Sequence, residues 1–236
     1  MEPMDGPSPE EMLQAYLLGY FPMDEPGAAE VGYYECDPRA VLPSRDLRVP
    51  RSVARALRRG EYEVHVDRAF DRVLAGCAAD RDDGVWLTPR LMRAYERLHT
   101  LGHAHSVEAW RGGELAGGLF GVALRGLFTS ESMFHRAPDA GHAALVGAGR
   151  LVADHGFALW DIQMASAHTR RFGAEEIPPE EYRARLDVAL IEERYGAATK
   201  AGTQALRFCE STRNYQINTG NSYYGAYQFN RITWLD

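Results

Sequence analysis

The sequence lacks any long hydrophobic run. Its apolar stretches are interrupted by glycine or charged residues well before the roughly 18 residues that a membrane span requires. The first residues, MEPMDGPSPEE, are acidic, whereas a secretory signal begins with positive charge. These absences predict a protein that has no signal peptide and no membrane partner and that works in the cytoplasm.

The sequence also has few cysteines and no cluster of metal ligands. Its three cysteines, Cys36, Cys77 and Cys209, are odd in number, far apart and without CxxC spacing. The eight histidines are scattered, and only His103 and His105 share a predicted strand face. We therefore expect free thiols and no metal site.

Two motifs of cofactor and nucleophile chemistry are missing. The glycines of GGLFG lie within a predicted strand and lack the GxGxxG spacing of a dinucleotide-binding loop. No serine lies in a GxSxG turn, which would present it as a nucleophile. The sequence therefore offers neither a dinucleotide-binding loop of this kind nor a serine nucleophile in such a turn.

Charge is distributed unevenly. The net charge of −7 disfavours nonspecific wrapping of duplex nucleic acid. Residues 45–59, however, contain six arginines and hardly an acid, with Arg51, Arg55, Arg58 and Arg59 at near-helical spacing. The pattern is typical of a solvated helix face and equally of a surface that contacts a phosphate backbone.

The order of the predicted elements indicates the fold class. Three apolar strands, separated by short glycine-bearing turns, precede a long helix and a further buried strand. They span about residues 105–111, 115–124, 127–134, 139–154 and 157–164. An antiparallel meander followed by a helix and a returning strand predicts an α+β protein with a mixed sheet flanked by helices.

Capping signals mark several helix starts. Ser8 and Thr88 are each followed by proline, as at the N-cap and first position of a helix. By the same reasoning, Asp67 is predicted to cap a helix that runs to about Ala78.

Two changes in composition divide the chain. The arginine-rich segment ends at Gly60, and after Tyr195 the sequence becomes rich in Asn, Tyr and Gly and nearly free of acids. We therefore predict a small N-terminal domain over 1–60, a catalytic domain over 61–195 and an appended tail over 196–236.

Four polar or aromatic residues are candidates for chemistry. Glu131 lies in an otherwise apolar strand, where a carboxylate must be paired, hydrogen-bonded or placed in a cleft. Asp161 and Gln163 are two residues apart in a strand and share a face, where they could orient an amine or satisfy the backbone. Trp86 precedes a helix start, a position that suits a core aromatic as well as one that stacks on a base.

At this point the sequence resembles the bacterial leucyl/phenylalanyl-tRNA-protein transferases. The resemblance extends over about residues 9–190 and includes LQAYLLGYFPM, DPRAVLP, GGLFGVALRGLFTSESMFHRAPDA and DIQMASAHTRRFGAEEIP. It implies a small N-terminal domain joined to an acetyltransferase-like domain that acts without cofactor or metal. It also implies transfer of leucine or phenylalanine from aminoacyl-tRNA to proteins with N-terminal Arg or Lys, which marks them for degradation. We expect a monomer.

The resemblance also implies roles for individual residues. Asp161 and Gln163 match a catalytic or positioning pair at the acceptor amine, and Trp86 matches an aromatic that stacks on the terminal adenine. The positions that match the aminoacyl pocket are Leu119, Phe128, Glu131 and Met133. Arg51, Arg55, Arg58 and Arg59 lie where the family contacts the acceptor stem. We expect Asp161→Ala to slow transfer and to leave the fold intact.

The sequence also departs from the family pattern at Met23, at Tyr33-Tyr34-Glu35-Cys36, which replaces an aromatic pair followed by Ser-Pro, and at His142. Met23 stands where the family often has a tryptophan after the Phe-Pro pair, so one wall of the adenine site is expected to be weaker. His142 stands where a lysine is common.

The tail resembles a different family. CESTRNYQINTGNSYYGAYQFNRITW is similar to the first half of a resuscitation-promoting-factor domain, a lysozyme-like module whose catalytic acid would match Glu210. Half of such a fold cannot bury a core, so we expect an inert appendage.

The sequence leaves two alternative functions open. One is a Fem-like aminoacyltransferase for peptidoglycan precursors, and the other is a muramidase that acts through Glu210 of the tail.

Overall fold

A computed structural model of the chain describes residues 6–79, 85–191, 223–224 and 229–230. Nearly all of the tail, including Glu210, therefore lies outside the described residues. Within the described residues, no helix is long and apolar enough to cross a membrane.

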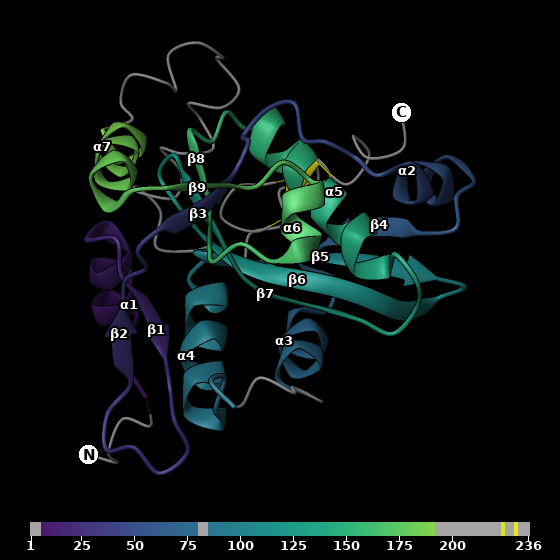
Figure 1. The fold of residues 1–236 in the computed structure, drawn as a ribbon. Coiled ribbons are helices and arrows are strands. Elements are labelled where there is room, and N and C mark those ends of the chain that lie inside the picture. Colours follow the sequence, from purple (N-terminus) through teal and green to yellow (C-terminus); the bar gives the residue numbers. More distant parts are fainter. Residues whose placement is uncertain (1–5, 80–84, 192–222, 225–228, 231–236) are drawn as a thin grey trace.

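A seven-stranded mixed sheet forms the centre of the fold (Figure 1). Its strand order is β4-β5-β6-β7-β8-β3-β9, and every neighbouring pair is antiparallel except β7 and β8. The strands are β3 (Arg39–Leu42), β4 (Glu63–Val66), β5 (Ala104–Arg111), β6 (Glu114–Leu124), β7 (Leu127–His135), β8 (Leu159–Gln163) and β9 (Glu175–Ile177). Two small hairpins pair β1 (Phe21–Met23) with β2 (Gly32–Tyr34) and β10 (Tyr223–Tyr224) with β11 (Phe229–Asn230).

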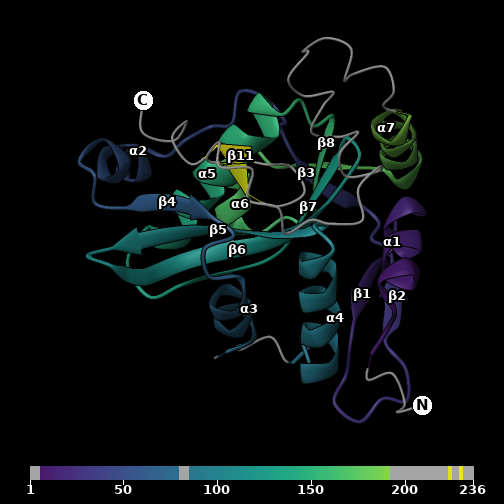
Figure 2. The ribbon, with the colours of Figure 1, turned by 180° about the vertical axis from the view of Figure 1, so that it is seen from behind.

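Helices cover both faces of the central sheet (Figures 1 and 2). The helices α3 and α4 pack on one face, α5 packs on the other, and α7 lies against β7 and β8. They are α1 (Pro9–Leu17), α2 (Arg51–Arg58), α3 (Phe70–Ala78), α4 (Pro89–Thr100), α5 (Ala140–Asp154), α6 (Ala167–Arg171) and α7 (Pro179–Leu190). This arrangement confirms the predicted α+β class with a mixed sheet flanked by helices.

The predicted caps of α1 and α4 are confirmed. The Ser8 hydroxyl accepts a hydrogen bond from the Glu11 amide at 3.1 Å, and Thr88 caps α4 through the Leu91 amide at 3.5 Å. Each hydroxyl thus satisfies one of the amides that a helix start leaves without an intrahelical partner.

The prediction that Asp67 caps α3 is wrong. Its Oδ1 accepts from the Ser106 amide at 2.8 Å and its Oδ2 contacts His105 Nδ1 at 2.7 Å, so the carboxylate fastens the end of β4 to β5. The amide of Ala69, at the start of α3, instead donates to Glu108 Oε1 at 2.8 Å. Asp67 therefore binds residues of β5 in place of the amides at the start of α3. The spacing of residues in the sequence does not reveal such a cross-strand contact.

The strand β3 connects the N-terminal segment to the sheet. It follows β2 in the chain but pairs with β8 on one side and β9 on the other. β3 thus belongs to the main sheet although it precedes residue 60. The division of the chain into domains at residue 60 stays a prediction.

The glycines of β6 let neighbouring atoms approach the strand closely. Replacing one of them tests the register of β6 against β7 directly. A Cβ at Gly121 would overlap the Thr129 carbonyl oxygen of β7, whereas a Cβ at Gly118 would lie 3.0 Å from Val73 Cγ2 and 3.1 Å from the Val107 carbonyl oxygen. We expect Gly121→Ala to lower the free energy of unfolding by at least about 3 kcal/mol and Gly118→Ala by about 1 kcal/mol. Urea denaturation measures both, and equal losses would contradict the register.

Candidate active site

The candidate site opens where β7 and β8 separate. The two parallel strands pair only from Leu127 with Leu159 to Thr129 with Asp161, although β7 continues to His135. Beyond this point their backbones no longer bond to each other, so side chains of both strands line a gap in the sheet. A ligand can enter there without breaking a strand ladder.

Two bulges lie at this point of separation. Phe120 faces Ser132 and Gly121 faces Ser130, so Glu131 is an extra residue in β7. In β8, Ile162 is an extra residue in the same way, opposite the step between Ala40 and Val41. Bulges re-aim side chains and are over-represented next to active sites.

A cavity of about 990 Å³ lies at this gap. It holds five of the residues predicted from the sequence: Trp86, Leu119, Glu131, Met133 and Gln163. Its other walls come from β1, the segment before α4, the N-terminal half of α5 and the α6 region, and include Met23, Leu145, Met164 and Thr169. The cavity is therefore apolar on several sides and polar at the two bulges.

Of the two acidic residues that the sequence analysis placed at the site, Glu131 and Asp161, Glu131 lines this cavity. Its Oε2 accepts from Tyr95 Oη at 3.1 Å and its Oε1 accepts from Thr129 Oγ1 at 2.5 Å, while Tyr95 in turn contacts Tyr16 Oη at 3.0 Å. Burial, reinforced by the negative charge of Asp161, raises the pKa of Glu131 to about 7, against the opposing effect of these hydrogen bonds. The carboxyl therefore exchanges protons near neutral pH.

Asp161 lies beneath the cavity rather than in its wall. The side chain is fully buried and forms an ion pair with Arg39, whose Nε and one terminal nitrogen donate to the two carboxylate oxygens at 2.9 and 2.5 Å. Tyr182 Oη and the Gln163 amide donate to the same oxygens at 2.8 and 2.9 Å. Four donors thus saturate this carboxylate.

Arg39 is a functional residue that the sequence analysis did not single out. Besides Asp161 it binds the Gly19 carbonyl oxygen at 3.1 Å, and its guanidinium lies over the rings of Phe21 and Tyr182. The signal available in the sequence was an arginine beside an apolar strand in DPRAVLP, since a buried arginine requires an acidic partner.

Gln163 carries backbone strain at the edge of the cavity. Its φ is +56°, a left-handed conformation that residues other than glycine seldom adopt. The bond from its amide to Asp161 helps to hold this conformation. Its side-chain nitrogen is satisfied by the carbonyl oxygens of Ser130 at 3.0 Å and Ile162 at 2.9 Å, which leaves the amide oxygen 3.4 Å from Glu131 Oε1.

Phe128 lies away from the cavity. It is buried on the α5 side of the sheet, with ring centroids 5.9 Å from Phe157 and 6.4 Å from Trp160. Its neighbour Thr129 faces the opposite side, because successive strand residues alternate. A place for Phe128 in the aminoacyl pocket therefore has no support from this geometry.

A second ion pair, between buried Asp24 and partly exposed Arg90, fixes the wall that holds Trp86. Asp24 follows β1 and binds Arg90 of α4 through both carboxylate oxygens, at 2.5 and 2.7 Å, and also accepts from Thr88. The Asp24 amide bonds to the Trp86 carbonyl oxygen at 3.0 Å. These contacts join two walls of the cavity, and nothing in the local sequence pattern indicated them.

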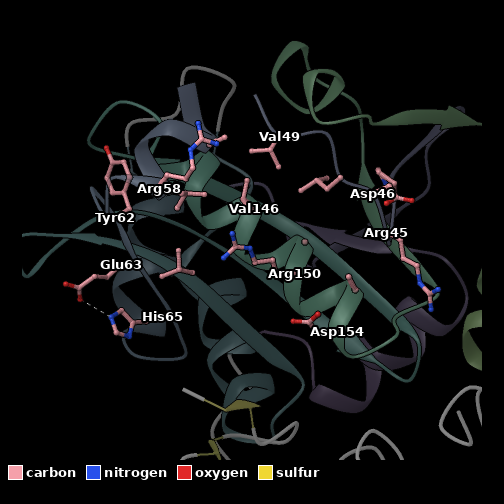
Figure 3. A pocket seen from close by; sticks show the side chains of 18 residues that line it. Arg45, Asp46, Val49, Arg58, Tyr62, Glu63, His65, Val146, Arg150 and Asp154 are labelled. Atoms are coloured by element: carbon pink, nitrogen blue, oxygen red, sulfur yellow. Dashed lines mark hydrogen bonds and ion pairs between the residues drawn. The ribbon is translucent and has the colours of Figure 1, made fainter. Parts of the chain in front are cut away.

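The arginines of α2 lie at a different place, beside a groove of about 1060 Å³ next to α5 (Figure 3). Arg51, Arg55, Arg58 and Arg59 are all exposed, and the first three form no ion pair with any described residue. Figure 3 shows charges of both signs along the groove, which are Arg45, Arg58 and Arg150 with Asp46, Glu63 and Asp154. The groove itself is electrically balanced, whereas the exposed face of α2 is purely basic.

Comparison with known proteins identifies the family of this chain. Residues 41–187, more than half of the chain, match the family model of the leucyl/phenylalanyl-tRNA protein transferases. The chain belongs to this family. A transferase of this name from Nitratidesulfovibrio vulgaris is 48% identical over 182 residues, which cover 76% of this chain and 77% of the relative. One from Rubrobacter xylanophilus is 47% identical over 79% of this chain and 97% of the relative.

Two further comparisons extend beyond the family. A solved structure of L-PGS from Bacillus licheniformis has a TM-score of 0.40 at 11% identity and covers 67% of this chain and 51% of that one. Residues 197–236 match the family model of a transglycosylase-like domain. This match agrees with the resemblance of the tail to a lysozyme-like module.

The buried ion pair changes the expectation for Asp161→Ala. The substitution leaves the Arg39 guanidinium buried without its partner, and we expect a loss of about 3–5 kcal/mol in the free energy of unfolding, measured by urea denaturation. The double variant Arg39→Met, Asp161→Leu removes both charges and should recover most of this loss. An Asp161→Ala protein as stable as wild type would contradict the pairing.

Proposed function

We propose that this protein, an aminoacyltransferase by family, transfers leucine or phenylalanine from the 3′ end of a charged tRNA to the α-amine of an acceptor protein. The observation that carries the proposal is the cavity at the separation of β7 and β8, in a chain of this family. The aminoacyl ester is already activated, so the protein must hold two substrates and manage one proton. No covalent intermediate on the enzyme is required.

The walls of the cavity support this pair of substrates. Leu119, Met133 and Leu145 offer an apolar surface for an unbranched-β side chain such as leucine or phenylalanine, whose burial contributes about 1.5–3 kcal/mol. Trp86 supports stacking of a base, worth about 1–3 kcal/mol. Met23 lies on the same cavity and provides an adaptable but weaker wall.

The finer features of the acceptor also belong to the proposal. We place proteins with N-terminal Arg or Lys at this site, marked by the transfer for degradation in the cytoplasm, and the enzyme as a monomer. Glu25 supports a cationic acceptor, since its carboxylate is exposed on the cavity rim, where it attracts positive charge.

The direct test is transfer of radiolabelled leucine from leucyl-tRNA to peptides that differ only in their first residue. Peptides beginning with Arg and Lys should be labelled, and the same peptide beginning with Ala should not. Absence of transfer to all three peptides would overturn the proposal. Labelling of a peptidoglycan precursor in place of the peptides would favour the Fem-like alternative.

The match of residues 197–236 to a transglycosylase-like domain supports a separate test of the tail. Clearing of cell walls by the full chain, abolished by Glu210→Gln, would assign a muramidase activity to it. We expect no clearing by either protein.

The basic face of α2 generates a prediction about tRNA. If Arg55 and Arg58 contact phosphates, replacing both with alanine should raise the KM for leucyl-tRNA. The slope of log K for tRNA binding against log salt concentration should become shallower by about 0.7–0.9 for each lost contact. The matched control replaces Arg183 and Arg185 of α7, which are exposed but paired with Glu35, Glu175 and Glu181. Equal effects of the two double variants would assign the loss to overall charge.

A further inference from the structure

We infer that Glu131 takes the proton from the acceptor amine, whereas Asp161 positions the site without exchanging a proton. The inference rests on the proposed function and deepens it by assigning the acid-base step to a specific carboxyl group. It differs from the expectation that Asp161 and Gln163 form the catalytic pair.

The surroundings of Asp161 leave it no capacity for proton transfer. Its oxygens accept two bonds from Arg39, one from Tyr182 and one from the Gln163 amide, and the side chain has no exposed surface. These four donors occupy the lone-pair sites of the carboxylate. The carboxylate is also separated from the cavity, whose lining includes Ile162 and Gln163 but not Asp161.

The surroundings of Glu131 are the opposite. The bulge in β7 turns it toward the cavity, where it is only partly covered. Tyr95 and Thr129 bind it from behind and orient the carboxyl group. A general base must lie within reach of the substrate proton and be held in one geometry, and of the two carboxyl groups only Glu131 meets both conditions.

The neighbours of Glu131 also accommodate its protonated form. With the Gln163 amide nitrogen directed to two carbonyl groups, the amide oxygen 3.4 Å from Oε1 can accept a hydrogen bond from the protonated Glu131 carboxyl. The Thr129 hydroxyl has a second acceptor in the Val122 carbonyl oxygen at 3.4 Å, so it can turn away when the carboxyl is protonated. Both protonation states therefore keep their hydrogen bonds.

The groups that face Glu131 tune it for this task. Tyr16 of α1, Tyr95 of α4 and Tyr182 of α7 are all held neutral, because burial and nearby carboxylates raise the pKa of each phenol. Asp161 of β8 supplies a negative charge, which Arg39 of β3 offsets. The result is a carboxyl with a pKa of about 7, close to that of the amine whose proton it accepts.

The proposed step balances as follows. The neutral α-amine attacks the ester carbonyl carbon, a C–N bond forms, and the amine proton passes to the Glu131 carboxylate. The C–O bond to the terminal ribose then breaks, and the proton leaves Glu131 for the ribose oxygen. The products are the extended protein and a free tRNA hydroxyl, with Glu131 returned to its ionised form.

The test is the pH dependence of kcat/KM for Glu131→Gln, with Glu114→Gln as the control. Below pH 7 the wild type needs both an ionised Glu131 and a neutral amine, so log(kcat/KM) should rise with a slope of about two, and the variant with a slope of about one. We expect kcat to fall about 100-fold with the KM for leucyl-tRNA changed less than about threefold. Glu114, an exposed residue of β6, should change neither.

One further variant, Asp161→Asn, and a melting curve separate catalysis from folding. Because the pKa of Glu131 is raised on folding, its ionised form destabilises the protein above about pH 7, and Glu131→Gln should melt no lower than wild type at pH 8. Asp161→Asn should lose stability but keep the slope of about two. A Glu131→Gln enzyme with the wild-type rate and slope would overturn the inference, as would a change in KM alone. A wild type that transfers nothing would instead overturn the proposed function.

Discussion

Arg39 and Asp161 form a buried ion pair on which the positions of several segments depend. Arg39 begins β3 and Asp161 lies in β8, and their partners add Tyr182 from α7 and the Gly19 carbonyl oxygen that follows α1. Both charges are almost completely removed from water, so each needs the other. The pair thereby fastens an N-terminal strand between β8 and β9 of a sheet built mostly from later parts of the chain, and it lies under the site.

The site itself comes from a local failure of sheet pairing. β7 and β8 stop bonding at Thr129 and Asp161, and each strand carries a bulge within two residues of that point. The left-handed Gln163 lies at the same place, held by the Asp161 carboxylate. Such strain persists only when the surrounding structure stabilises it. The ion pair and the cavity are therefore two parts of one arrangement, in which rigid strands below support an opening above.

Two carboxyl groups lie close together in this arrangement and have opposite surroundings. Asp161 meets a guanidinium and further hydrogen-bond donors, whereas Glu131 is buried near the negative charge of Asp161, and both effects raise its pKa against the hydrogen bonds from its hydroxyl neighbours. Pairs of acids whose environments differ in this way divide structural and proton-transfer tasks between them. Residue type alone does not distinguish the two tasks.

The sequence by itself determined most of the elements, the family and several of the residues around the cavity. Helix caps at Ser8 and Thr88, the antiparallel meander and the odd acid at Glu131 follow from local chemistry, which acts over a few residues. Tertiary structure decided the place of β3 beside β8, the use of Asp67 across strands, the burial of Asp161 against Arg39 and the orientation of Phe128 away from the cavity. These features join residues distant in the chain, and their energy comes from burial and charge pairing that exist only once the segments have met.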